Sequence, residues 1–356
     1  MTTHRAALAL CLVTVALMLI TGCPQREPRL PEGEVLAEAP PPEVEATLDG
    51  AGGDLIIAMI AKSSTNPVFL SARSGAEDAA VELSSLHDMD IIIDWRTPPT
   101  EDGQVQAQRI AQAVNEGADA ILISCSDAAK VTGAINDAVA RGVPVMTFDS
   151  DAPDSDRFAF YGVDDIKTGA AVMDELAPLL GEKGKVAILA GNQNAPNLQK
   201  RVQGVKQAAE QYPDIEIIGT FYHPETPQDA AAEVVRVMNA YPDISGWAFI
   251  GGWPLFTKSL LDELDPAKVK VVSVDALPAE LPYIEAGITP VLLAQPTYKW
   301  GYVSVETIVK KVVLGQEVEE INEMELVRVT KENLGEWARQ LRDWGFTDVP
   351  EEYLSM

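Results

Sequence analysis

The chain repeats one unit from Asp54 onward: a short apolar run, a polar or glycine-rich turn, then a segment with helical periodicity. Apolar residues recur at i, i+3, i+4 and i+7 in three of these segments, Ala107/Ile110/Ala111/Val114, Ala231/Val234/Val235/Met238 and Val305/Ile308/Val309/Val312. The runs predicted to be strands are Leu55–Ile60, Met89–Trp95, Ala120–Ser124, Pro144–Phe148, Lys185–Ala190, Ile215–Phe221, Gly246–Ile250, Val269–Val274 and Pro290–Ala294. Strands that are apolar throughout and alternate with helices predict parallel sheets covered on both faces.

The pattern is also duplicated, because "GADAILISCSD" in the first half has a counterpart in "DISGWAFIGGW" in the second. This number of strands suits two sheets better than one. We therefore expect an α/β protein of two doubly wound, flavodoxin-like lobes with a cleft between them and a hinge that joins them. The expected first lobe holds residues 54–163 plus about 296–323, and the second holds 164–295 plus about 324–356.

The segment before the first strand has a different character. Arg5 precedes the apolar stretch Ala6–Ile20, and Ile20-Thr21-Gly22-Cys23 resembles a bacterial lipoprotein signal. We expect residues 1–22 to be removed and Cys23 to carry the lipid; a simple secretory signal with an accidental cysteine is the alternative. Residues 23–53 are rich in proline and acids and poor in large apolar groups, which predicts a disordered tether.

Charge and composition exclude several classes of function. A formal net charge of −27 over 356 residues repels phosphate backbones, so we expect no nucleic-acid partner. The three cysteines and three histidines show no metal-binding spacing, so we expect no metal site. No GxSxG elbow, GxGxxG loop or Walker loop is present. We accordingly expect no catalytic residues and no cofactor.

Polar and aromatic residues follow the predicted strands, where open parallel sheets bind their ligands. The segments are "AKSSTNPVF" after the first run, "SCSD" after the third, "DSD" after the fourth, and later "GNQNAPN", "YHPE", "GGW", Asp275 and Gln295. Carboxylates and amides bond pairs of hydroxyls, and flat rings cover apolar sugar faces. The set therefore indicates a polyhydroxylated ligand.

Residues 54–325 resemble the type I periplasmic sugar-binding proteins, which include the ribose, rhamnose and autoinducer receptors of ABC transporters. The motifs that carry the resemblance are "IIAMIAKSSTNPVF", "GADAILISCSD", "GVPVMTFDSD", "VVSVDALP" and "LLAQPTYKWG". The interval from Asp275 to Gln295 also resembles the family's spacing of a ligand-binding Asp and Gln. The resemblance implies a receptor whose lobes close on a ligand and which performs no chemistry.

The resemblance also implies particular ligand contacts. Asp149 matches the Asp that clamps sugar hydroxyls, and Ser150 stands where ribose receptors have Arg. The residues expected to bind the ligand are Lys62, Asn66, Phe69, Asp149, Asn197, Arg201, Trp253, Asp275 and Gln295. Lys62 and the "Asp-Ser-Asp" that begins at Asp149 are more similar to rhamnose and autoinducer receptors than to ribose receptors. Asp151 is expected to brace either Lys62 or its own loop.

The functional prediction is a lipid-anchored solute-binding protein at the bacterial cell membrane, with its globular part periplasmic or extracellular. Its expected partners are a monosaccharide or sugar-like small molecule, an ABC transporter permease, and the membrane through Cys23. A ligand-sensing lipoprotein that presents a sugar-like signal to a membrane receptor is an alternative that the sequence leaves open. A carbohydrate-active enzyme is a less favoured one.

Overall fold

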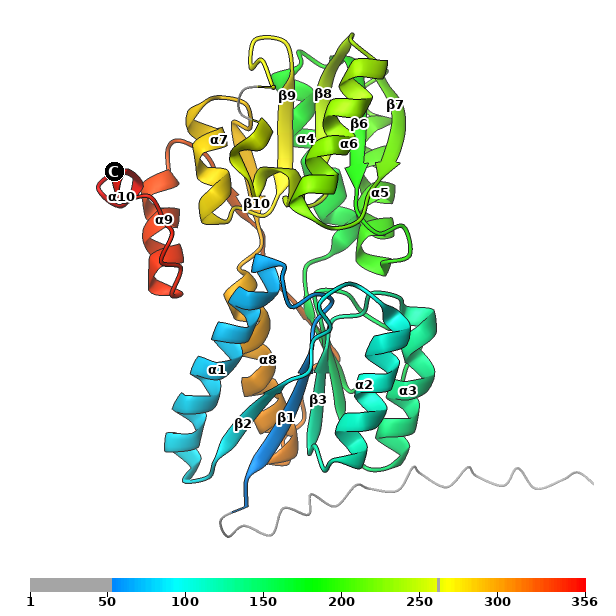
Figure 1. Cartoon of the computed structure of the whole chain (residues 1–356), viewed down its shortest axis with the longest axis vertical. Helices are drawn as coiled ribbons and strands as arrows, with labels where there is room; N and C mark the ends of the chain where they lie inside the picture. Colours follow the sequence, from blue (N-terminus) through cyan, green and yellow to red (C-terminus); the bar gives the residue numbers. More distant parts are fainter. Residues whose placement is uncertain (1–52, 261–262) are drawn as a thin grey trace, which may run out of the picture. The chain divides into compact units, whose positions relative to one another are not determined.

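The computed structural model describes residues 53–260 and 263–356. The expected signal, Cys23 and almost all of the tether lie outside these residues. Two six-stranded sheets with interleaved helices form the described part, so the predicted two-lobed α/β fold is confirmed (Figure 1). Within these ranges no helix has both the length and the apolar character needed to cross a membrane.

The first sheet has the strand order β11-β5-β4-β3-β1-β2, and every neighbouring pair is parallel. Its strands are β1 (Leu55–Ile60), β2 (Ile91–Trp95), β3 (Ala120–Ile123), β4 (Val145–Phe148), β5 (Ala159–Gly162) and β11 (Ile321–Glu323). The helices of this first lobe are α1 (Pro67–His87), α2 (Gly103–Asn115), α3 (Ala128–Ala140) and α8 (Thr297–Val312). Helices α1 and α8 lie on one side of the sheet, and α2 and α3 on the other (Figure 1).

Strand β1 shows why its sequence is apolar at every position. Ile57 and Met59 pack into the hydrophobic cluster with α1 and α8, while Ala58 and Ile60 pack into the separate cluster with α2 and α3. Successive side chains of a strand point to opposite faces, so a central strand covered on both faces carries apolar residues on both.

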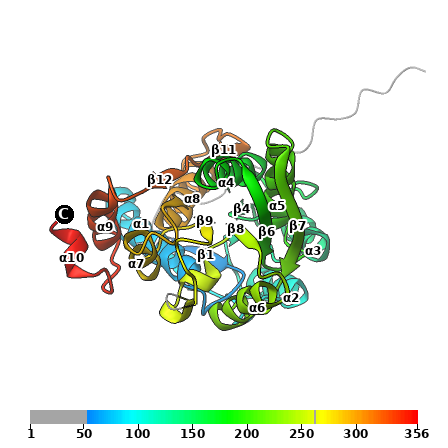
Figure 2. The same ribbon diagram turned by 90° about the horizontal axis from the view of Figure 1, so that it is seen from above.

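The second sheet has the order β12-β10-β9-β8-β6-β7, parallel except for the antiparallel pair of β10 and β12. Its strands are β6 (Lys183–Ala190), β7 (Asp214–Tyr222), β8 (Ile244–Phe249), β9 (Lys270–Val274), β10 (Val291–Ala294) and β12 (Val327–Val329). Its helices are α4 (Asp165–Leu179), α5 (Pro196–Ala209), α6 (Pro227–Ala240) and α7 (Leu281–Glu285), with the short 3₁₀ turns η1 (Trp253–Leu255), η2 (Lys258–Leu260) and η3 (Pro278–Glu280). Figure 2 shows α4 and α5 on one side of this sheet and α6 on the other.

The nine predicted strands are present, but β5, β11 and β12 were missed. β5 is only four residues long, and β11 and β12 are three-residue strands, "INE" and "VRV", in a segment rich in charge. Edge strands as short as β11 and β12 carry no apolar run, because only one neighbour and part of one face cover them.

The chain passes between the two sheets after β5, after β10 and between β11 and β12. It ends with α9 (Leu334–Asp343) and α10 (Glu351–Leu354). These helices lie at the edge of the second lobe beside α7 (Figures 1 and 2). The indole Nε1 of Trp337 donates a hydrogen bond to the carbonyl oxygen of Ala276 at 2.7 Å, which holds the turn after β9.

Two helix pairs meet through glycines. A Cβ on Gly301 of α8 would lie 1.8 Å from the carbonyl oxygen of Ala72 in α1, and a Cβ on Gly169 of α4 would lie 1.9 Å from that of Arg201 in α5. Only glycine permits backbones this close. The contacts fix α1 and α5, the helices that begin at the cavity described below.

Candidate functional site

The carboxyl ends of strands from both sheets meet at one interlobe cavity. All the residues selected from the sequence line it: Lys62, Asn66, Phe69, Asp149, Asn197, Arg201, Trp253, Asp275 and Gln295. Its volume is about 20 Å³, room for roughly one water molecule. The polar side chains bond one another across the cavity, which in this arrangement is too small for a molecule of several heavy atoms.

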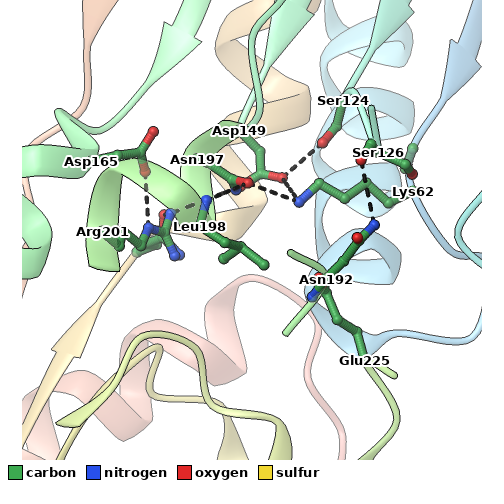
Figure 3. Close-up of polar contacts among 12 residues, drawn as sticks. Lys62, Ser124, Ser126, Asp149, Asp165, Asn192, Asn197, Leu198, Arg201 and Glu225 are labelled. Atoms are coloured by element: carbon green, nitrogen blue, oxygen red, sulfur yellow. Dashed lines mark hydrogen bonds and ion pairs between the residues drawn. The ribbon is translucent and has the colours of Figure 1, made fainter. Parts of the chain in front are cut away.

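Asp149 stands directly after β4 with a positive φ of 57°. Its Oδ2 accepts a hydrogen bond from Ser124 Oγ at 2.7 Å, and its Oδ1 accepts one from Asn197 Nδ2 at 3.1 Å (Figure 3). Its backbone N–H donates a hydrogen bond to the carbonyl oxygen of Tyr161 in β5 at 3.1 Å, which fixes the turn against that strand. Asp149 belongs to the first lobe and Asn197 to the second, so this carboxylate bridges the lobes.

Lys62 follows β1 and is buried with its ammonium 3.6 Å from Asp149 Oδ2. It also donates a hydrogen bond to Asn197 Oδ1 at 3.2 Å. Burial alone would lower the pKa of Lys62, but the attraction of Asp149, Glu225 and Glu101 outweighs burial and raises the pKa above its usual value. Lys62 is therefore charged at every physiological pH.

Arg201 lies one helical turn after Asn197 on α5, so both side chains reach the same side of the helix. Its Nε donates to Asp165 Oδ1 at 2.9 Å, and its two terminal nitrogens donate to the carbonyl oxygen of Ile250 at 3.2 Å and to Gln295 Oε1 at 2.8 Å. Asp165 begins α4, and the ion pair ties α5 to it.

Asp275 and Gln295 come from the neighbouring strands β9 and β10. Gln295 Nε2 donates to Asp275 Oδ1 at 2.9 Å, and the backbone N–H of Gly252 donates to Oδ2 at 3.1 Å. Burial raises the pKa of Asp275, although Arg201 and these hydrogen bonds act in the opposite direction. Asp275 also has a positive φ, of 77°, which turns the chain at the end of β9 as at Asp149.

Aromatic rings from both lobes border the cavity. Phe69 stacks on Trp300 with ring centroids 6.0 Å apart, and Phe148 completes this first-lobe cluster. Trp253 of the second lobe is 5% exposed and meets the ring of His223 edge-on at 5.2 Å. Phe69 and Trp253 thus pack into their own lobes and also face the cavity. Asn66 has a double role as well, because its Oδ1 caps α1 by accepting from Val68 N at 3.2 Å.

Sequence reasoning missed several participants: Ser124, Asp165, Glu225, Phe256 and Trp300. Ser124 lies in "SCSD", Glu225 in "YHPE" and Trp300 in "YKWG", segments already noted at strand ends or in motifs. The position after a strand identifies the segment that lies near the cavity, but it does not show which side chain of that segment points into the cavity. Asp165 and Phe256 carried no signal in the sequence.

Asp151 braces its own loop. Its carboxylate accepts two hydrogen bonds from Arg157, at 2.6 and 2.8 Å, and one from Thr147 Oγ1 at 2.6 Å. Asp154 and Asp156, farther along the same acidic run, are exposed. Across the part of the chain that the structure covers, no group of three or more His, Cys, Asp or Glu side chains is placed to hold a metal ion.

Comparison with known proteins gives a family match over most of the chain. Residues 57–317 match the family model described as "Periplasmic binding protein domain". The ribose import binding protein of Bacillus subtilis is 26% identical over 200 residues, which cover 56% of this chain and 59% of that protein. The D-apiose import binding protein of Actinobacillus succinogenes is 26% identical over 197 residues, 54% of this chain and 60% of that protein. The chain thus spans about three fifths of the length of these relatives.

Solved structures share the fold. A solute-binding protein of an ABC transporter from Burkholderia graminis, in complex with D-arabinose, has a TM-score of 0.72 at 24% identity and covers 78% of this chain and 96% of its own. One from Agrobacterium vitis with bound D-fucose has a TM-score of 0.74 at 22% identity and covers 80% and 99%. At this identity the likeness concerns the arrangement of the two lobes.

Proposed function

Because the chain belongs to the periplasmic binding protein family, we propose that it is a solute-binding protein that captures a sugar or sugar-like molecule between its lobes. The observation that carries this proposal is the convergence of all nine selected residues, from the strand ends of both sheets, on one interlobe cavity. The relatives support it, since they are named as import binding proteins for ribose and D-apiose.

The side chains around the cavity suit a ligand with several hydroxyl groups. Asp149 and Asp275 offer carboxyl oxygens as acceptors, Asn197 and Gln295 can donate and accept, and Lys62 donates. In the closed arrangement these side chains form hydrogen bonds with one another. Ligand hydroxyls would therefore replace these hydrogen bonds and would not pair with groups that lack a partner. Rings such as Phe69 and Trp253 would cover the apolar faces of a sugar.

Entry of the ligand requires a hinge motion of the proposed lobes, residues 54–163 plus about 296–323 against 164–295 plus about 324–356. The three connections between the sheets, after β5, after β10 and between β11 and β12, are the segments that would bend. Opening would break the bonds that Asn197 makes with Asp149 and Lys62. Ligand binding would restore equivalent bonds and favour closure.

A thermal-shift and calorimetric screen over neutral monosaccharides, deoxysugars, sugar alcohols and sugar acids tests this function. A ligand that binds the folded state raises the melting temperature, by mass action. We expect at least one class to do so without being converted to product. If no member of the panel stabilises the protein, or if a bound sugar is turned over, the receptor function is refuted.

The proposal extends to a lipid anchor at Cys23 and to delivery of the ligand to an ABC transporter permease. Mass spectrometry of the mature N-terminus should find Cys23 diacylated after removal of residues 1–22, and an unmodified cysteine would contradict the anchor. Deleting the gene should abolish high-affinity uptake of the identified ligand, and a Cys23→Ala variant should release the protein from the membrane fraction.

A further inference from the structure

A second hollow, the side groove, adjoins the interlobe cavity and shares Asn66, Glu225 and Phe256 with it. It has a volume of about 940 Å³ and is lined from both lobes. Pockets for small ligands are commonly about 300–1,000 Å³. The side groove therefore offers space for a ligand substituent that extends out of the interlobe cavity.

Two glutamates from opposite lobes meet in this groove. Glu101 follows β2 in the first lobe, and Glu225 follows β7 in the second. Both carboxylate oxygens of Glu101 are buried and neither makes a well-formed hydrogen bond, although Glu225 and Asn192 lie close enough to act on its pKa. Burial and the repulsion of Glu225 raise the pKa of Glu101 well above its usual value.

Glu225 is held in position from its own lobe. Its Oε1 accepts a hydrogen bond from the backbone N–H of Asn192 at 2.9 Å, and a Cβ on Gly191 would lie 2.6 Å from its Cγ. Asn192 in turn reaches across to the carbonyl oxygen of Ser126 in the first lobe, at 3.4 Å. Figure 3 shows Asn192 between Ser126 and Glu225. Closure of the lobes therefore brings the two carboxylates together.

Three cations near the groove each face an acid already. Lys62 faces Asp149 at 3.6 Å, and Arg201 faces Asp165 at 2.9 Å. Lys130, at the rim of the groove, pairs with Asp127 at 3.6 Å. Lys62 also attracts both glutamates, but it faces Asp149 as well, and Arg201, the other cation that acts on Lys62, is held by Asp165.

A buried, unpaired carboxylate is costly unless a positive charge or a proton accompanies it. Tyr222 lines the same groove and is 46% exposed, so its ring is available to a cation as well. A positive group on the ligand would supply the missing charge at the moment the lobes close on it.

We propose that the side groove is a subsite for a cationic group of the ligand, such as a primary amine, held between the carboxylates of Glu101 and Glu225. The inference rests on the proposed sugar-binding function and narrows its substrate class to amine-bearing sugars or polyols. The hydroxyls of such a ligand bind in the interlobe cavity, and its amine binds in the side groove.

Matched ligands test the subsite by calorimetry at pH 7. The sets are D-galactosamine, D-galactose and N-acetyl-D-galactosamine; the corresponding glucose derivatives; and 1-amino-1-deoxysorbitol with sorbitol. We expect at least one free amine to bind tenfold or more tightly than its hydroxyl and acetylated counterparts. Glu101→Gln and Glu225→Gln should each remove most of that ratio, whereas Asp154→Asn, an exposed acid in another loop, should keep it.

The inference is overturned if the neutral sugars match the amines in every set, or if the preference survives both glutamine variants. It is also overturned if only neutral sugars bind, if their affinity rises as the pH falls from 8 to 5.5, and if Glu101→Gln abolishes this pH dependence. That result would mean that Glu101 and Glu225 take up a proton and not a cationic group. In each of these cases a sugar or amino sugar still binds, so the receptor function stands. If nothing in these sets binds while a sugar of the broader screen does, the subsite is refuted and the receptor function stands. If no member of either panel binds, the receptor function itself fails.

Discussion

The ion pair of Lys62 and Asp149 makes the sharpest test of the site. The two charged atoms are 3.6 Å apart, and the side chains are 2% and 4% exposed. At an effective dielectric constant of about 20 their gross attraction is roughly 5 kcal/mol. The cost of desolvating both groups offsets much of this, so the net contribution of the pair is far smaller.

Asp149→Asn keeps the shape of the side chain and removes its charge. Losing one partner of a buried pair costs about 3–5 kcal/mol. Because Glu225 and Glu101 also attract Lys62, we expect the lower end, a loss of about 3 kcal/mol in the free energy of unfolding. Urea denaturation of wild type, Asp149→Asn, Lys62→Met and the double variant measures it. The double variant should be more stable than the sum of the single effects predicts, by about 1–3 kcal/mol.

Asp154→Asn is the matched control, since that acid is exposed, and its effect should stay within about 0.5 kcal/mol. For binding, Asp149→Ala removes charged hydrogen bonds worth about 1.5–3 kcal/mol each. Two such bonds correspond to an affinity loss of about 10²- to 10⁴-fold. Additive single variants in the urea series, together with an unchanged ligand affinity, would refute the assignment of Asp149 as the central carboxylate.

Three further predictions concern the rest of the fold. Gly301→Ala should destabilise the protein by several kcal/mol, because its Cβ would lie 1.8 Å from the carbonyl oxygen of Ala72. A Cβ on Gly133 of α3 meets nothing within 4 Å, so Gly133→Ala should stabilise the protein slightly. Thermal unfolding compares the two variants, and equal shifts in melting temperature would contradict the contact between α1 and α8. Burial raises the pKa of Glu280, so the folded protein holds a proton that the unfolded chain releases. The free energy of unfolding should therefore fall as the pH rises above about 4.5. Glu280→Gln should make this fall with pH shallower, and an unchanged pH dependence would contradict the prediction. Cys125 is fully buried and burial raises its pKa, so a thiol reagent should label it only after unfolding. Rapid labelling of Cys125 in the folded protein would contradict this burial.

Several parts of the site followed from sequence because they obey local rules. Asp149, Asp275 and Gln295 stand directly after apolar runs, so the position of each was tied to the end of a strand. The amphipathic repeats of α2, α6 and α8 were equally visible. Short strands with charged residues, such as β11 and β12, follow no such rule, since their place depends on the sheets they join.

The amino-acid sequence by itself determined the alternation of buried strands and helices, and hence two parallel sheets with polar groups at their carboxyl ends. Only the tertiary structure decided which polar groups meet. Arg201 pairs with Asp165, 36 residues away, and Glu101 faces Glu225 from the other lobe. Burial and secondary structure are set by the periodicity of neighbouring residues, whereas ion pairs and unpaired charges depend on distances between segments that only the folded lobes bring together.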